Sequence, residues 1–158
     1  MSSVPMPPAG LDLEHFLPYR LSVLSNRVSG AIARMYSERF GLGVTEWRVM
    51  AVLGRYPGLS AGEVAQRTAM DKVAVSRAVA GLVDAGHVER QTHDEDRRRS
   101  VLRLSAAGRA IFDEVAPLAM AFERRLLDGM APSERDVLFG LLDRLDELEL
   151  QAEADLGT

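Results

Sequence analysis

The segment from Ser60 to Ser105 constrains the fold of this chain more than any other. It contains two short helical patterns joined by a tight turn, and then two strand-like runs joined by a loop with three consecutive arginines. A helix pair of this kind followed by a β-hairpin is typical of a winged helix-turn-helix. We therefore predict that residues 45–105 form such a module and that the rest of the chain presents it.

Capping signals define the two helices of the module. Ser60 followed by Glu63 is a capping box, which predicts a helix over 61–68. Asp71 is positioned to cap a second helix over 72–85, because its side chain can accept hydrogen bonds from the free N–H groups of the first helical turn. The second helix is the expected recognition helix.

Helical patterns also precede these two helices. Thr45 is a suitable N-cap for a short helix over 46–55. Before it, apolar residues at three- and four-residue steps predict a helix of about 25 residues that starts near Leu11 and closes near Gly41. Pro18 lies in its first turns, so it either kinks this helix or marks its true start.

Two strand candidates follow the recognition helix. Residues 87–93 and 100–105 contain alternating apolar and polar positions, and all six residues of the loop 94–99 are charged. Burial of so many charges would be very costly, so the loop must project into solvent. The pattern predicts a hairpin with a projecting tip, which is the wing of the module.

The charges are unevenly distributed along the chain. The net charge is −4, yet residues 60–103 hold eight basic and seven acidic residues, whereas residues 104–158 hold five and twelve. Salt screens separated charges beyond about 8–10 Å, so a basic segment can bind phosphates although the whole chain is acidic. The module and its arginine-rich wing therefore predict double-stranded DNA as a partner.

The helices outside the module have wide apolar stripes that a compact winged helix does not need. They cover residues 11–40 and 106–150, and Pro117 should bend or split the second group. Such stripes are covered if these helices pack together and against a second copy, which predicts a homodimer. Residues 1–10 are expected to be a loose arm and residues 151–158 a short tail.

Composition excludes several classes of protein. The chain has 158 residues, 47% of them hydrophobic, and no cysteine, so it can form a globular core but has no disulfide and no thiolate ligand. It shows no secretory signal and no stretch near the roughly 18 apolar residues of a membrane span. We expect a cytoplasmic protein with no membrane association.

Residues 11–150 resemble, as a single domain, the MarR family of bacterial winged-helix transcription regulators. The order and spacing of five segments support the resemblance: Thr45-Glu46-Trp47-Arg48-Val49-Met50, Asp71-Lys72-Val73-Ala74-Val75-Ser76-Arg77, Leu82-Val83-Asp84-Ala85-Gly86-His87-Val88-Glu89-Arg90, Asp96-Arg97-Arg98-Arg99-Ser100-Val101-Leu102-Arg103-Leu104-Ser105, and Gly108.

The resemblance implies a mainly α fold with a small β-hairpin (α+β), with a winged helix-turn-helix core and terminal helices that dimerise. It implies a homodimeric repressor on a pseudo-palindromic operator. Many family members release DNA when they bind a small aromatic acid, while others respond to oxidants or metals. The absence of cysteine and the scattered positions of the three histidines depart from the thiol- and zinc-sensing branches.

The predicted DNA contacts fall into three groups. The recognition helix and the start of the preceding helix supply base and phosphate contacts. In the wing, Arg98 is expected to enter the minor groove, and Arg97 and Arg99 to meet phosphates. The resemblance to the family implies that Asp96 orients these basic side chains. The candidates outside the wing are Ser60, Ala61, Lys72, Val73, Ala74, Ser76 and Arg77.

A small-molecule effector, such as an aromatic carboxylate, has its candidate contacts near the first long helix and the helix after it. They are His15, Tyr19, Arg20, Tyr36, Trp47 and Arg48. No arrangement of catalytic residues or metal ligands stands out, so we predict neither an enzyme nor a cofactor. Two alternatives stay open: a winged-helix module that binds other proteins, and a DNA-binding regulator or activator without an effector.

Overall fold

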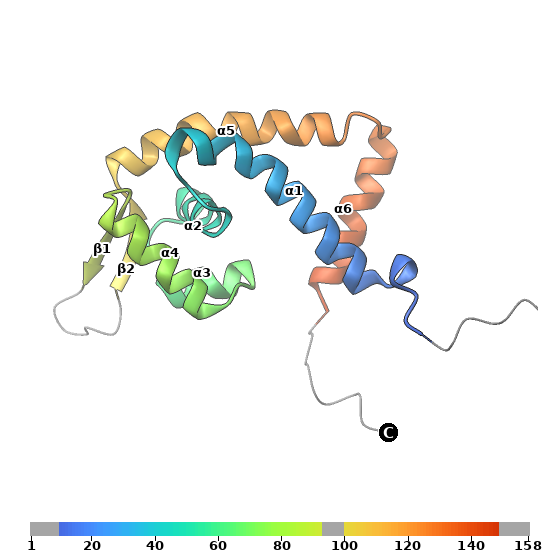
Figure 1. Ribbon diagram of the computed structural model, residues 1–158, viewed down its shortest axis with the longest axis horizontal. Helices are drawn as coiled ribbons and strands as arrows, with labels where there is room; N and C mark the ends of the chain where they lie inside the picture. Colours follow the sequence, from blue (N-terminus) through green and yellow to red (C-terminus); the bar gives the residue numbers. More distant parts are fainter. Residues whose placement is uncertain (1–9, 93–99, 149–158) are drawn as a thin grey trace, which may run out of the picture. The chain divides into compact units, whose positions relative to one another are not determined.

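The computed structural model describes residues 10–92 and 100–148 (Figure 1). The chain divides into two compact units, with the boundary between Ala119 and Met120. The described residues are mainly helical with one two-stranded hairpin, which confirms the predicted fold class. The elements are η1 (Leu13–His15), α1 (Leu17–Phe40), α2 (Val44–Arg55), α3 (Ala61–Thr68), α4 (Lys72–Asp84), β1 (Val88–Thr92), β2 (Ser100–Leu104), α5 (Ala106–Leu126) and α6 (Pro132–Asp146).

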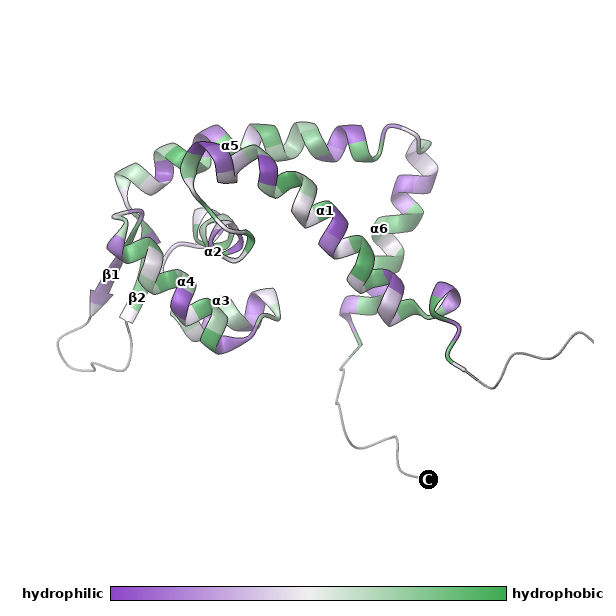
Figure 2. Ribbon diagram, viewed as in Figure 1, coloured by the Kyte–Doolittle hydropathy of each residue, from purple (hydrophilic) through white to green (hydrophobic). Residues whose placement is uncertain are grey.

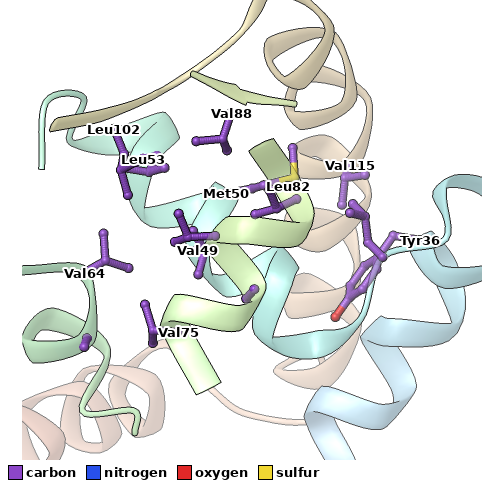
Figure 3. Close-up of a cluster of buried hydrophobic side chains, with 14 residues drawn as sticks. Tyr36, Val49, Met50, Leu53, Val64, Val75, Leu82, Val88, Leu102 and Val115 are labelled. Atoms are coloured by element: carbon purple, nitrogen blue, oxygen red, sulfur yellow. The ribbon is translucent and has the colours of Figure 1, made fainter. Parts of the chain in front are cut away.

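The first unit is built around one apolar core, to which α1 to α5 and both strands contribute (Figure 3). Complete burial of one large apolar side chain stabilises the fold by about 1.5–3 kcal/mol. The largest side chains that are almost completely buried are Tyr36, Met50, Leu53, Leu82, Leu102, Val49, Val64, Val75, Val79 and Val115.

The predicted helix-turn-helix is confirmed. The Ser60 hydroxyl accepts a hydrogen bond from the Glu63 N–H at 3.1 Å, and the Asp71 carboxylate accepts one from the Ala74 N–H at 3.0 Å. Between the two helices Ala69 has a left-handed backbone with φ +51°. This conformation reverses the chain within two residues and brings the start of α4 next to α3.

The start of α2 differs from the prediction. Gly43, not Thr45, is the N-cap, and its N–H donates to the Glu46 carboxylate at 3.2 Å. Thr45 already lies in the first turn of the helix. A glutamate at the third helical position can satisfy the N–H of the capping residue by itself, so no hydroxyl cap is needed.

The first long helix also starts later than expected. α1 begins at Leu17, and only the short turn η1 precedes it, because Phe16 has an extended backbone. Pro18 lies in the first turn of α1 and therefore marks the true start of the helix, where its missing N–H costs no hydrogen bond. At the other end, Gly41 closes α1 in a left-handed conformation.

The hairpin is anchored in the core. Antiparallel pairing runs from Val88 opposite Leu104 to Thr92 opposite Ser100, and an isolated bridge joins Leu59 to Leu102 on the other side of β2. Because Val88 and Leu102 are buried, the register of the two strands is fixed at their base.

The second unit contains the end of α5 and all of α6. Pro117, which lies in the part of α5 that belongs to the first unit, does not split the helix: α5 continues through it. In α6, Glu134 accepts a hydrogen bond from the Ala131 N–H at 3.0 Å and Pro132 occupies the first turn. In α6 a hydrophilic first part is followed by a mainly hydrophobic stretch (Figure 2). None of its described side chains is buried, and Val137 is 61% exposed.

None of the described helices is both long enough and apolar enough to cross a membrane.

A test of the fold is available where α5 meets the end of the recognition helix. Gly108 packs so closely against the His87 carbonyl that a Cβ would overlap it. We expect Gly108→Ala to lower the free energy of unfolding by about 1–3 kcal/mol in urea denaturation. Gly30→Ala is the control: its Cβ would meet no atom within 4 Å, and it should stabilise α1 by up to about 1 kcal/mol. Equal stabilities of the two variants would contradict the packing described.

Candidate nucleic-acid interface

The recognition helix α4 has one buried and one exposed face. Val75, Val79 and Leu82 are each 0% exposed, so the rotation of the helix about its axis is fixed by the core. The opposite face is exposed and lines a shallow depression. Its residues are Lys72, Val73, Ser76, Arg77 and Ala80.

One predicted contact of this helix, Ala74, lies at the border of the exposed face. Ala74 is half-buried at the edge of the exposed face. It lines a separate recess between α4 and the first turn of α2, together with Thr45 and Glu46. Arg77 lines both this recess and the exposed depression, so its side chain lies at the boundary between them.

The start of α3 lies next to the start of α4. Ser60 and Lys72 line the same recess, although twelve positions separate them in the sequence, and Met70 and Glu63 also line it. Ala61 is half-buried beside Ser60 in the first turn of α3. The tight turn thus brings a helix N-terminus and a lysine side chain together, and both attract anions.

The wing candidates Asp96, Arg97, Arg98 and Arg99 lie outside the described residues. The last described pair of the hairpin is Thr92 opposite Ser100. Near the opposite end of the same strands, Arg103 donates a hydrogen bond to the Glu89 carboxylate at 2.9 Å. Within the described part of the chain, neither Lys72 nor Arg77 forms a salt bridge. Both side chains are exposed, so they can approach DNA without first breaking an ion pair.

Three of the effector candidates form one cluster. The Tyr36 and Trp47 rings lie 5.6 Å apart, and Trp47 stacks on Phe112 of α5 at 6.0 Å. The adjacent Arg48 donates to the Ser29 hydroxyl at 2.7 Å. Burial raises the pKa of Tyr36 above 10.0, and the charge of Arg48 partly offsets this rise.

The cluster also touches the helix-turn-helix. The Arg48 guanidinium is half-buried and lies 4.0 Å from the sulfur of Met70, which precedes the N-cap of α4. Within the described residues Arg48 has no carboxylate partner. It is therefore a partly desolvated cation close enough to Tyr36 to affect its pKa, and such a guanidinium suits a planar carboxylate.

The other three effector candidates lie far from this cluster. His15 contacts Asp12 at 2.8 Å, and Arg20 donates to the Glu14 carbonyl at 2.9 Å. Both line a shallow groove along the start of α1, and Tyr19 is 41% exposed. Arg20 and Tyr36 are sixteen positions apart in the same helix, or about 24 Å along its axis. One small ligand cannot touch both groups within one chain.

Comparison with known proteins supports this fold. The MarR family model matches residues 40–99. The HTH-type transcriptional repressor Rv2887 of Mycobacterium tuberculosis is 30% identical over 123 residues, which are 77% of this chain and 85% of that protein. The crystal structure of a MarR/EmrR family transcriptional regulator from Acinetobacter sp. ADP1 superposes with a TM-score of 0.79 at 29% identity, covering 86% and 96% of the two chains. The chain belongs to the MarR family.

A further relative fits this assignment. The HTH-type transcriptional regulator BilQ of Clostridium symbiosum is 30% identical over 93 residues, which are 59% of this chain and 65% of that protein, just under two thirds. MarR-family members are transcription regulators with a winged helix, so this chain is one as well. The described residues hold no group of three or more potential metal ligands.

Sequence reasoning missed three neighbours of the aromatic cluster in this MarR-family chain. Ser29, Met70 and Phe112 contact Arg48 or Trp47 from α1, the α3–α4 turn and α5. Their sequence separations from these partners range from 19 to 65 positions. Helical periodicity gives no signal for contacts between separate elements, so only the tertiary structure identifies them.

The raised pKa of Tyr36 predicts a loss of stability at alkaline pH. Well below pH 10, Tyr36 is neutral in both states and adds no pH dependence to the stability. Above pH 10 this tyrosine ionises first in the unfolded chain, so its contribution to the free energy of unfolding falls. We expect Tyr36→Phe to lose less stability than wild type between neutral pH and about pH 11, measured by urea denaturation. The matched control is Tyr19→Phe, which removes a hydroxyl group from a ring that is 41% exposed.

Proposed function

We propose that this MarR-family regulator is a repressor that binds a pseudo-palindromic operator as a homodimer and leaves it when a small aromatic carboxylate binds. The observation that supports this most directly is the exposed face of α4, with Lys72, Ser76 and Arg77 held outward by a buried opposite face. The repressor Rv2887 is 30% identical over most of its length.

Proteins that share the fold give limited support. FabT of Streptococcus pneumoniae was crystallised in complex with DNA and superposes with a TM-score of 0.67 at 24% identity. PcaV of Streptomyces coelicolor was crystallised with its natural ligand and superposes with a TM-score of 0.69 at 23% identity. At these identities the likeness shows the fold alone, so the assignment of partners rests on the residues of this chain.

The proposed dimer rests on apolar side chains that the chain leaves exposed. At the start of α1, Leu17, Leu21 and Leu24 are exposed, and in α6 Val137 and Leu141 are exposed. A second copy can cover such faces through a two-fold axis. Two recognition helices would then enter the major groove about 34 Å apart, one turn of DNA.

On the operator, α4 would enter the major groove. The N-terminus of α3 at Ser60 and Ala61 would hold a phosphate, and Arg77 would reach a guanine or a phosphate. In the wing, Arg98 would enter the minor groove, with Arg97 and Arg99 on phosphates and Asp96 orienting them.

The effector would bind at the cluster of Tyr36, Trp47 and Arg48. A carboxylate can accept two hydrogen bonds from the Arg48 guanidinium, and a ring can stack beside Trp47. The Ser29 hydroxyl would then lose the hydrogen bond that Arg48 donates to it, or share Arg48 with the carboxylate. Arg48 also contacts Met70, so a movement of the Arg48 side chain would displace the turn that positions α4. This contact is a physical route from ligand to recognition helix.

DNA binding is tested with fluorescence anisotropy on the DNA upstream of the gene and on random duplex. We expect Arg98→Ala to weaken binding to all sequences, and Arg77→Ala to cost about 1–3 kcal/mol on the operator and to change the preferred sequence. Arg34→Ala, on the exposed side of α1, is the control and should bind like wild type. Absence of binding to any duplex at low salt would favour a protein-interaction module.

Effector binding is tested by thermal shift with benzoate, salicylate and hydroxynicotinate. A ligand present at 100 times its Kd stabilises the folded state by about 2.7 kcal/mol. We expect Arg48→Ala to abolish the shift and Arg20→Ala to retain it. The reverse result would move the site to the start of α1. If no aromatic acid shifts the wild type or releases its DNA, this effector class is wrong.

A further inference from the structure

One aliphatic side chain on α4 serves no purpose in the fold of the described residues. Val73 is 56% exposed, while the buried face of the helix is supplied by Val75, Val79 and Leu82. A β-branched residue in a helix is less favourable than alanine by several tenths of a kcal/mol. Neither burial nor helix propensity therefore explains a valine at this position.

Val73 is also unusual in the middle of the chain. Between residues 25 and 117, the described part of the chain exposes only two large hydrophobic side chains, Val73 and Tyr56. The Tyr56 ring is faced by the guanidinium groups of Arg67 at 4.1 Å and Arg55 at 4.9 Å, so it has partners within the chain. Of the two exposed residues, only Val73 is aliphatic. It lies on the face of α4 that carries Lys72 and Arg77.

The neighbours of Val73 indicate what it contacts. Ser76 and Arg77 lie three and four positions later and therefore on the same side of the helix. Together with Lys72 and Ala80 they line a shallow depression. An isolated methyl-rich surface surrounded by two cations and a hydroxyl does not suit a protein core, but it suits the major groove, where phosphates flank the C5-methyl group of thymine.

We propose that Val73 reads a thymine methyl group in each operator half-site. The inference rests on the proposed DNA binding by α4 and specifies the base that this binding requires. Val73 and Arg77 are about 6 Å apart along the helix axis, and base pairs stack about 3.4 Å apart. The required thymine therefore lies within about two base steps of the position that Arg77 contacts. Ser76, between them, supplies the adjacent hydrogen bond.

The test removes single methyl groups from the DNA. The full-length protein first selects its operator from random duplexes, and each thymine of one half-site is then replaced by deoxyuridine, which keeps the base pair and loses only the methyl. One thymine should show a penalty of about threefold to fivefold in Kd, since a buried methylene contributes about 0.8 kcal/mol. The equivalent thymine of the other half-site should show the same penalty.

The contact is assigned to Val73 by a double-mutant cycle. Val73→Ala should bind the thymine operator more weakly than wild type and should no longer distinguish thymine from deoxyuridine at that position. Ser76→Ala is the matched comparison on the same face, and it should keep the full deoxyuridine penalty whatever its own affinity. Circular dichroism and thermal melting confirm that Val73→Ala is folded, as its exposure predicts.

The outcomes separate this inference from the proposed function. If wild type binds a selected operator but no deoxyuridine substitution weakens it, or if the penalty survives in Val73→Ala, the thymine contact is wrong and DNA binding stands. If the selection enriches no sequence, specific DNA binding itself is wrong, and the thymine contact fails with it.

Discussion

The packing of α4 against α2 is the interaction on which the rest of the first unit depends. Val75 and Leu82 of α4 and Val49 and Met50 of α2 are each 0% exposed and lie in the same core (Figure 3). A helix buried along one stripe cannot rotate without exposing that stripe, at a cost of about 1.5–3 kcal/mol for each side chain. The outward face of α4 is thus set by residues that never contact a partner.

The turn before α4 shows how this packing compensates for local strain. Ala69 has a left-handed backbone, which costs roughly 1–2 kcal/mol for a residue other than glycine. The burial of Val64 and Ala65 on one side and of Val75 on the other outweighs this cost. The hydroxyl of Thr68 donates to the Val64 carbonyl at 2.7 Å, which helps to terminate α3 where the turn begins.

The aromatic cluster has a different origin, because it exists only where three helices meet. Tyr36, Trp47 and Phe112 come from α1, α2 and α5, and Arg48 joins them to the turn at Met70. A half-buried guanidinium that lacks a carboxylate partner in the described residues is costly unless hydrogen bonds compensate. The Ser29 hydroxyl supplies one. The contact between Arg48 and Met70 joins this cluster to the turn that precedes α4.

The sequence by itself determined the features that depend on short-range interactions. The caps at Ser60 and Asp71 and the two strands were predictable, because a cap joins residues three positions apart and a hairpin joins neighbours in the chain. Even short-range signals can compete. At the start of α2 the Glu46 carboxylate caps the Gly43 N–H, so the hydroxyl cap predicted at Thr45 is not needed. In α1, Pro18 lies in the first turn, and the helix starts later than its apolar pattern predicts.

The tertiary structure decided which residues share a surface. It placed Ala74 at the edge of the exposed face of α4, and it separated Arg20 from Arg48, which the sequence predicts as contacts of the same effector. Periodicity gives the angle of a side chain around its own helix but not the element that packs against it. The location of a binding site therefore depends on long-range packing, which the order of residues does not specify by itself.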